Sequence, residues 1–222
     1  MRTADVVTGF LVSNKMDELG KPESKETILI LRLFHLIFSA LSKFHDIEIV
    51  IRTHAAELVE KCLRGVQEAA DPSSYIRLLR YIFRSFHHTK IESLYREFAL
   101  LLPQAVHTLL TMLDAPDNFN IEEALIELCL RLPARLTNLL PYLKCLMKPL
   151  VRALRGSDEL VVLGLCTLEL WVDAMYMEFL DPNSKVVDQD LVLALLGLLK
   201  PPTSASTPPA IAMKAMQLVG KL

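Results

Sequence analysis

A junction of only a few residues separates two strongly apolar helical patterns within the segment ALRGSDELVV, at residues 153–162. Gly156 suits the position just after a helix, because glycine adopts a positive φ at little cost. Ser157 suits the position just before the next helix, where its hydroxyl can accept a hydrogen bond from an N–H of the first turn. So short a link forces the chain to turn back on itself, so we expect two antiparallel helices packed as a hairpin.

The two sides of this junction differ in how their apolar residues are distributed. The segment 141–155 carries them on one face, at positions i, i+3, i+4, i+7, i+8 and i+11. The segment 158–175 is apolar almost all round, with a thin polar line through Glu169 and Asp173. A helix that is apolar on most sides must be covered on most sides. We therefore predict an inner helix at 158–175 and an outer helix at 141–155.

Similar helical patterns recur along nearly the whole chain. Signals for strands are almost missing, since the sequence has no sustained period-2 alternation, no Asn-Gly or Asp-Gly turn and only seven glycines. The sequence therefore predicts an all-α fold. The ten expected helices cover residues 24–43, 48–69, 73–87, 90–101, 103–114, 120–131, 141–155, 158–175, 188–200 and 208–221.

Short breaks containing proline punctuate these helices at spacings of a few tens of residues. They include Asp71-Pro72, Leu102-Pro103 and Leu132-Pro133. Pro149 falls inside an expected helix, where it removes one backbone hydrogen bond and kinks the axis. A bent outer helix with a proline, a tight turn with an acidic residue and an inner helix together resemble a HEAT repeat. We therefore expect an α-solenoid of stacked antiparallel helical hairpins.

The whole chain, residues 1–222, is predicted to be a single HEAT-repeat solenoid segment. A solenoid end without a polar cap would expose its core, so we expect the segment to be part of a much larger chain. One low-complexity stretch, PPTSASTPP at residues 201–209, has a composition that cannot build a core. We expect it to be an exposed Pro/Ser-rich loop between the last two helices.

The charge balance, the lengths of the apolar stretches and the cysteines limit which partners the protein can bind and in which cellular compartment it can occur. The chain has 24 basic and 26 acidic residues, and a net charge of -2 gives no reason to expect nucleic acid or an anionic membrane as partner. No stretch reaches the roughly 18 to 20 apolar residues of a membrane span, and the N-terminus lacks a signal-peptide pattern. Each of the four cysteines lies in an apolar helical pattern, where we expect it to pack as a small apolar residue: Cys62, Cys129, Cys145 and Cys166. The cysteines form no C-x-x-C pair, which favours a soluble protein of a reducing, intracellular compartment.

The sequence offers no residue set for catalysis, for a cofactor or for a metal. The six histidines are scattered, and neither a G-x-S-x-G motif nor a glycine-rich phosphate loop occurs. The pair His87-His88 has no further ligand at a spacing typical of zinc sites. We therefore predict no catalytic, cofactor-binding or metal-binding residues, no small-molecule substrate and no enzyme activity.

Three arginines, Arg77, Arg80 and Arg84, form a stripe opposite the apolar face of residues 75–86. A row of guanidinium groups could bind successive phosphates of a nucleic acid. The same row could instead be a solvated helix face, or could form ion pairs with a neighbouring repeat. The nearly neutral net charge favours a solvated or ion-paired face over a nucleic-acid contact.

Several stretches of sequence carry a resemblance to a known family, among them SLYREFALLLPQAVHTLL at 93–110. The others are SYIRLLRYIFRSF at 74–86, LPARLTNLLPYLKCLMKPLVRAL at 132–154, and GLCTLELWVDAM at 164–175 followed by EFLDP. These stretches resemble the HEAT-repeat region of the transformation/transcription domain-associated protein family. Its members are very large pseudokinases related to the phosphatidylinositol-3-kinase-like kinases, and the resemblance covers most of this chain.

The resemblance implies a non-catalytic, nuclear scaffold. Its expected partners are subunits of histone acetyltransferase co-activator complexes and transcription activators. Two alternatives stay open. The HEAT region of an active phosphatidylinositol-3-kinase-like kinase would be revealed by an intact catalytic loop beyond Leu222. An armadillo or importin-type transport adaptor should show repeated Trp and Asn positions, whereas this sequence has a single Trp.

Overall fold

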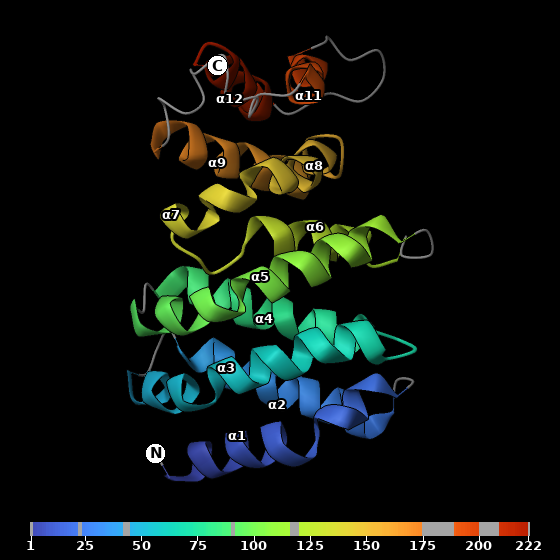
Figure 1. Ribbon diagram of the computed structural model, residues 1–222, viewed down its shortest axis with the longest axis vertical. Coiled ribbons are helices and arrows are strands. Elements are labelled where there is room, and N and C mark those ends of the chain that lie inside the picture. The colour runs from blue at the N-terminus through green and yellow to red at the C-terminus, as the bar shows by residue number, and fades with distance from the viewer. Residues whose placement is uncertain are drawn as a thin grey trace. The chain divides into compact units, whose positions relative to one another are not determined.

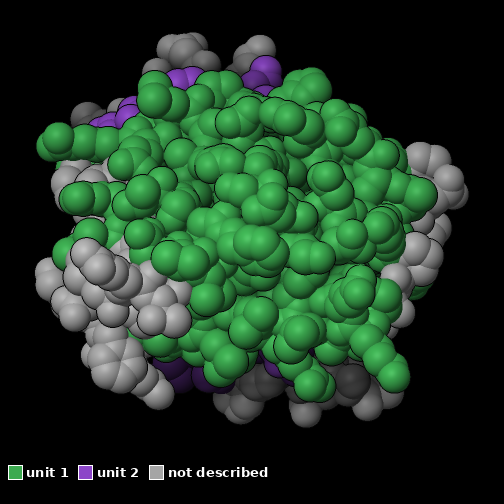
Figure 2. All heavy atoms as spheres, turned by 90° about the horizontal axis from the view of Figure 1, so that it is seen from below, with its two compact units in different colours: residues 1–135 green, residues 136–222 purple. Residues whose placement is uncertain are grey.

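Helices account for all regular secondary structure in the described part of the chain, which is residues 2–21, 24–41, 45–89, 92–115, 120–174, 189–199 and 209–221. The computed structural model divides the chain into two compact units, unit 1 (residues 1–135) and unit 2 (residues 136–222). Figure 1 shows the helices of both units, and Figure 2 views unit 1 from the side on which α1 lies. The predicted all-α, HEAT-like fold class is confirmed.

Unit 1 consists of six α-helices and one short 3₁₀ helix (η1) among its described residues. They are α1 (Arg2–Asn14), η1 (Met16–Gly20), α2 (Lys25–Leu41), α3 (His45–Glu68), α4 (Ser73–Thr89), α5 (Glu92–Asp114) and α6 (Glu122–Leu130).

These helices form two layers in which equivalent helices pack side by side. Helices α1, α3 and α5 form one layer, and helices α2, α4 and α6 form the other (Figure 1). His54 Nε2 on α3 lies 3.1 Å from Asp5 Oδ1 on α1, 49 residues away. The hydroxyl of Ser85 on α4 donates to the carbonyl of Phe38 on α2 over 3.3 Å, across 47 residues. Offsets of this size are close to the length of about 40–47 residues of a HEAT or armadillo repeat.

Aromatic side chains fill the space between neighbouring helices of unit 1. Phe83 on α4 and Phe98 on α5 meet edge to face with ring centroids 5.5 Å apart. Phe38 on α2 and Phe86 on α4 meet in the same way at 6.4 Å. All four rings are buried, and edge-to-face pairs add about 0.5–1.5 kcal/mol each to the free energy gained from burial. The repeating layers are therefore held mainly by apolar packing.

Unit 2 contains a second set of helices. They are α7 (Leu136–Leu139), η2 (Leu140–Tyr142), α8 (Leu143–Leu154), α9 (Asp158–Ala174), α11 (Gln189–Leu199) and α12 (Pro209–Val219).

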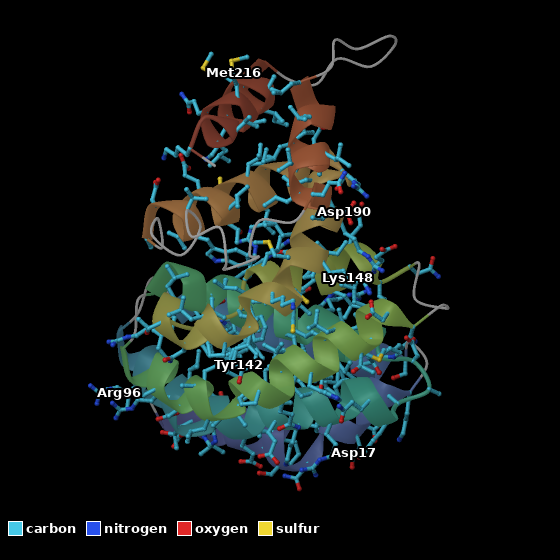
Figure 3. The ribbon with its side chains drawn as sticks, turned by 45° about the horizontal axis from the view of Figure 1, so that its top comes forward. Asp17, Arg96, Tyr142, Lys148, Asp190 and Met216 are labelled. Carbon is cyan, nitrogen blue, oxygen red and sulfur yellow. The ribbon has the colours of Figure 1, made fainter. Side chains whose placement is uncertain are left out.

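Helix α12 packs along α9, and helix α11 packs against both α8 and α12. Lys214 on α12 lies 2.8 Å from Glu169 on α9, and Lys221 after α12 lies 2.5 Å from Asp173. The last pair is 48 residues apart, an offset like those in unit 1. Met216 projects from the outer side of α12 and is 63% exposed (Figure 3).

The predicted hairpin of α8 and α9 is confirmed, but its junction differs in detail from the prediction. The N–H of Gly156 donates to the carbonyl of Ala153 over 3.1 Å, and the φ of Gly156 lies outside the left-handed region. The prediction of a positive φ at Gly156 is therefore wrong. A tight last turn of α8 gives the carbonyls of Arg152 and Ala153 their hydrogen-bond donors, so the chain needs no left-handed residue here. The carbonyl of Ser157 accepts from Val161 over 2.9 Å, so Ser157 stands at the start of α9 as predicted.

The apolar stripe predicted for the outer helix is confirmed, because its members are all buried: Leu143, Leu146, Met147, Leu150, Val151 and Leu154. The prediction that the inner helix is covered on most sides is only partly correct. Val162 is 46% exposed, Leu170 is 60% exposed and Cys166 is exposed, and these residues follow one another at intervals of four along α9. One face of α9 is therefore open to solvent.

Pro103 does not end a helix, contrary to the prediction of a break between 101 and 103. It lies inside α5, which continues through it from Glu92 to Asp114. Leu102 and Val106 are buried on either side of it, and Pro103 itself is exposed. Packing of one apolar face before and after the proline offsets the backbone hydrogen bond that the proline removes.

Three helices are present that the sequence pattern does not predict: α1, η1 and α7. Most of the expected loop at residues 201–209 lies outside the described residues, and Pro209 is the first residue of α12. The other predicted helices are present with ends shifted by a few residues, and the break at Leu132-Pro133 is confirmed.

Gly65, inside α3, has to lack a side chain. A Cβ atom at this position would lie 2.7 Å from Cδ1 of Tyr75, whose hydroxyl donates to the buried carbonyl of Met16 over 2.8 Å. We expect Gly65→Ala to destabilise the chain by about 1–3 kcal/mol, because the Tyr75 ring has to move. Gly197→Ala, at a helical position where a Cβ would meet nothing within 4 Å, should stabilise the chain by up to about 1 kcal/mol. Thermal unfolding of both variants measures these opposite shifts; a loss of stability in both would contradict the assignment to Tyr75.

Candidate interaction surface

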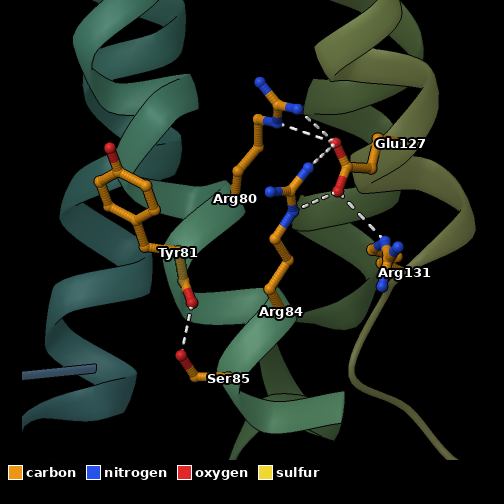
Figure 4. A network of polar contacts seen from close by, with 6 residues as sticks. All are labelled: Arg80, Tyr81, Arg84, Ser85, Glu127 and Arg131. Carbon is orange, nitrogen blue, oxygen red and sulfur yellow. Dashed lines mark hydrogen bonds and ion pairs between the residues drawn. The ribbon is translucent and has the colours of Figure 1, made fainter. Parts of the chain in front are cut away.

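The arginine stripe on α4 is used for packing against α6. Arg80 Nε and a terminal nitrogen of Arg80 donate to Glu127 Oε2 over 2.9 and 2.6 Å (Figure 4). Arg84 Nε donates to the other oxygen, Oε1, over 2.6 Å. Arg131, one turn after Glu127 on the same helical segment, places its Nε 3.1 Å from Oε1 as an ion pair without hydrogen-bond alignment. Of the two alternatives to a nucleic-acid contact, a solvated face or ion pairs between repeats, Arg80 and Arg84 form the ion pairs.

Glu127 is almost completely buried, with 5% of the residue exposed. Burial raises the pKa of its carboxyl, but the hydrogen bonds from Arg84 and Arg80 outweigh this and lower the pKa below the ordinary value. The carboxylate therefore stays charged at neutral pH. It links α4 to α6 through charge-assisted hydrogen bonds, and this cluster is structural.

The histidines do not converge on a common site in the described part of the chain. His54 pairs with Asp5, and the ring of His35 lies against Tyr81 with centroids 4.8 Å apart. The side chains of His45, His87 and His88 lie outside the described residues. Within the described ranges, no group of three His, Cys, Asp or Glu residues could hold a metal ion.

The four cysteines are free thiols and divide into two kinds. Cys62 and Cys129 are buried, and burial raises the pKa of the Cys129 thiol to about 12. Cys145 and Cys166 are exposed, so the prediction that each cysteine packs as a small apolar residue is wrong for these two. Both occupy a solvent-facing position on a helix whose other face is buried, a distinction that composition does not reveal.

A basic ridge lies on the solvent-facing side of unit 2. It consists of Lys144, Lys148, Arg152 and Arg155, which fall on one face of α8 and of the turn that ends it (Figure 3 labels Lys148). Lys144, Lys148 and Arg155 are exposed, and Arg152 is half-buried. Residues 128–157 contain six basic residues and no Asp or Glu. This local excess, together with the i, i+4, i+8 spacing, is the signal by which the ridge could have been found in the sequence.

A pocket of about 340 Å³ opens beside the end of this ridge. Buried side chains of Leu154, Val161 and Ile211 line it from α8, α9 and α12. Leu193, on α11, also lines it and is 52% exposed. Arg155 lines the same pocket, so the ridge and the pocket are continuous.

Apolar residues are also exposed on the first two helices of unit 1. Val6 and Phe10 on α1 are 68% and 53% exposed. Leu29 and Leu36 on α2 are 58% and 63% exposed. None of the helices in the described part of the chain combines the length and apolar character needed to cross a bilayer.

Comparison with known proteins gives one family for most of the chain. Residues 2–202 match the family model described as the Tra1 HEAT repeat central region. The chain is 36% identical over 219 residues to Transcription-associated protein 1 of Drosophila melanogaster, and 35% identical over 222 residues to the human Transformation/transcription domain-associated protein. These alignments cover 98% and 99% of the chain.

A yeast protein is similar to the same degree. The SAGA complex/NuA4 acetyltransferase complex subunit TRA1 of Saccharomyces cerevisiae is 34% identical over 220 residues, which is 99% of the chain. In each of these three relatives the aligned part is 6% of the relative's own length.

Proposed function

This chain belongs to the Tra1 HEAT repeat central region family, and on that basis we propose that it is a non-catalytic scaffold segment of a large transcription co-activator subunit. The proposal assigns it protein-protein contacts within a histone acetyltransferase complex and with transcription activators. The observation that carries it is the match of residues 2–202 to a HEAT-repeat region, together with identity of 34–36% to relatives of which one is named as a SAGA and NuA4 subunit.

The exposed apolar side chains support a role in contacts. In unit 1 they include Phe10 and Leu36, and in unit 2 they include Leu170 and Met216. Repeats of about 47–49 residues bury their apolar faces against neighbouring repeats. The helix faces that carry these exposed apolar side chains therefore suit contacts with further repeats of a longer chain. We propose that residues 1–222 form one segment of such a chain and that the protein acts in the nucleus.

Affinity purification of the tagged full-length protein from nuclear extract tests this function. We expect acetyltransferase-complex subunits to co-purify and the eluate to acetylate histones. A catalytically inactive scaffold should show no phosphotransfer beyond that of a mock purification. Recovery of the protein without acetyltransferase subunits, or with a phosphotransfer activity of its own, would overturn the proposal.

A further inference from the structure

A thiol, an amine and a carboxylate meet where α12 packs along α9 in unit 2. Lys214 Nζ on α12 donates to Cys166 Sγ on α9 over 3.2 Å, across 48 residues of sequence. The same nitrogen lies 2.8 Å from Glu169 Oε2, also on α9. Cys166 is exposed, and the side chains of Lys214 and Glu169 are 30% and 37% exposed. Reagents in solution can therefore reach two nucleophiles that are already in contact.

The surroundings of Cys166 suit reaction of its thiol with an electrophile. The thiolate is the reactive form of cysteine, and a neighbouring ammonium group favours it. Cys62 and Cys129 lack access to solvent because they are buried, and burial raises the pKa of the Cys129 thiol to about 12. Cys145 is exposed, but no amine within the described ranges donates to its sulfur. Cys166 alone of these four thiols combines exposure with an amine in contact.

The amine of Lys214 is a poor nucleophile toward a reagent in solution. Its hydrogen bond with Glu169 raises the pKa of Lys214 above the ordinary value, so little neutral amine is present at neutral pH. An acyl group carried on Cys166 changes this situation, because the attack is then intramolecular and the reactants are held together. Glu169 Oε2, 2.8 Å from Nζ, is placed to accept a proton as the nitrogen attacks.

We propose that Cys166 and Lys214 form a self-acylation site for acyl thioesters such as acetyl-coenzyme A, in which Cys166 accepts the acyl group and passes it to Lys214. In the first step the Cys166 sulfur attacks the acyl carbon, a new thioester forms, and coenzyme A leaves with the thiol proton. In the second step the Lys214 nitrogen attacks the same carbon, an amide forms, and the C–S bond breaks. Of the two protons that the ammonium group loses, one passes through Glu169 to the released sulfur and the other goes to water.

Acylation changes the contact between α9 and α12. It removes the charge of Lys214, and with it the ion pair to Glu169, while the pair of Lys221 with Asp173 at the end of α12 remains. The proposal goes beyond the proposed function and does not depend on it, because it requires only an acyl thioester and this contact within unit 2.

Incubation of the full chain with acetyl-coenzyme A, followed by mass spectrometry of its peptides, tests the site. Lys221 is the internal control, because it also pairs with a carboxylate of α9 but donates to no thiol among the described residues. Lys221 is the more exposed amine, at 41% against 30% for Lys214. We nevertheless expect Lys214 to be acetylated at least about tenfold faster than Lys221, because its acyl donor is held beside it.

Variants separate the two steps. Cys166→Ser should slow acetylation of Lys214 by about tenfold or more and leave Lys221 unchanged, because the acyl carrier is lost. Lys214→Arg keeps a positive charge beside Cys166 but removes the acceptor amine, so a thioester sensitive to neutral hydroxylamine should accumulate on Cys166. Cys145→Ser removes the other exposed thiol and should change neither rate. Circular dichroism and the fluorescence of Trp171 establish that each variant is folded.

Three results would overturn the proposal. They are equal rates at Lys214 and Lys221, a rate at Lys214 that Cys166→Ser leaves unchanged, and an acyl group that stays on Cys166 in the unaltered chain. These results leave the co-purification of acetyltransferase subunits unaffected, and that measurement tests the proposed function separately.

Discussion

Leu168→Ala is expected to destabilise unit 2 by about 2–5 kcal/mol, the range found when a fully buried leucine is truncated. Leu168 is completely buried on α9, and the cavity left by the missing atoms cannot be filled by its neighbours without repacking. Trp171, the single tryptophan of the chain, is 2% exposed on the same helix. Its fluorescence during denaturant unfolding therefore reports directly on the unit that carries the substitution.

Leu170→Ala is the matched control, because it makes the same chemical change two residues away. Leu170 is 60% exposed, and substitutions at such positions change the free energy of unfolding by no more than about 0.5 kcal/mol. Comparable losses for Leu168→Ala and Leu170→Ala would show that the face assigned to solvent is buried in solution.

Glu127→Gln is expected to destabilise unit 1 by about 2–3 kcal/mol. It removes the charge that Arg80 and Arg84 share and leaves their guanidinium groups facing each other without a carboxylate. The loss should fall below the 3–5 kcal/mol typical of a fully buried pair, because these two arginine side chains are 36% and 46% exposed and can turn to water. Hydrogen exchange of α4 and α6 locates the effect.

Glu123→Gln is the control for this substitution. Glu123 is exposed in the first turn of α6, where a negative charge contributes only a few tenths of a kcal/mol through the helix dipole. Faster exchange confined to α6 in the Glu127 variant, with α4 unchanged, would contradict the proposed link between the two helices.

The pH dependence provides a second test of the Glu127 cluster. Its pKa in the folded chain is lowered from an ordinary value of 4.5, so the carboxylate stabilises the fold fully above that value. This contribution is lost as the pH falls through the lower, folded-state pKa. The difference in stability between wild type and Glu127→Gln should therefore be full at neutral pH and should shrink in acid. A difference that persists unchanged in acid would contradict a charged Glu127.

The periodic spacing of apolar residues predicts the helices of this chain correctly where side-chain packing and the backbone preferences of the residues agree. The stripe from Leu143 to Leu154 is an example, since every member that the period places on one face is buried. Pro103 is the opposite case. Its local preference is to end a helix, but the apolar face formed by Leu102 and Val106 continues on both sides and holds α5 together.

The candidate surface could be predicted only in part. The basic residues of α8 and their spacing are visible in the sequence, whereas the pocket beside Arg155 is formed by residues from α8, α9, α11 and α12. No periodic pattern indicates that Leu154 and Ile211 line the same pocket, because this depends on how α12 packs along α9. The sequence likewise indicated that Arg80 and Arg84 could form ion pairs with a neighbouring repeat, but only the fold identified Glu127 as their partner.

The amino-acid sequence by itself determined that this protein is helical, that its helices turn back on one another and that it belongs among HEAT-repeat proteins. These properties follow from spacings of 3.6 residues and from short breaks, which act over a few turns of chain. Tertiary structure alone decided which apolar and charged side chains are buried and which stay exposed, as with Leu168 and Leu170. Burial depends both on the partner helix of the same hairpin and on helices about 40–50 residues away, and the offset between helices is set by packing rather than by local sequence.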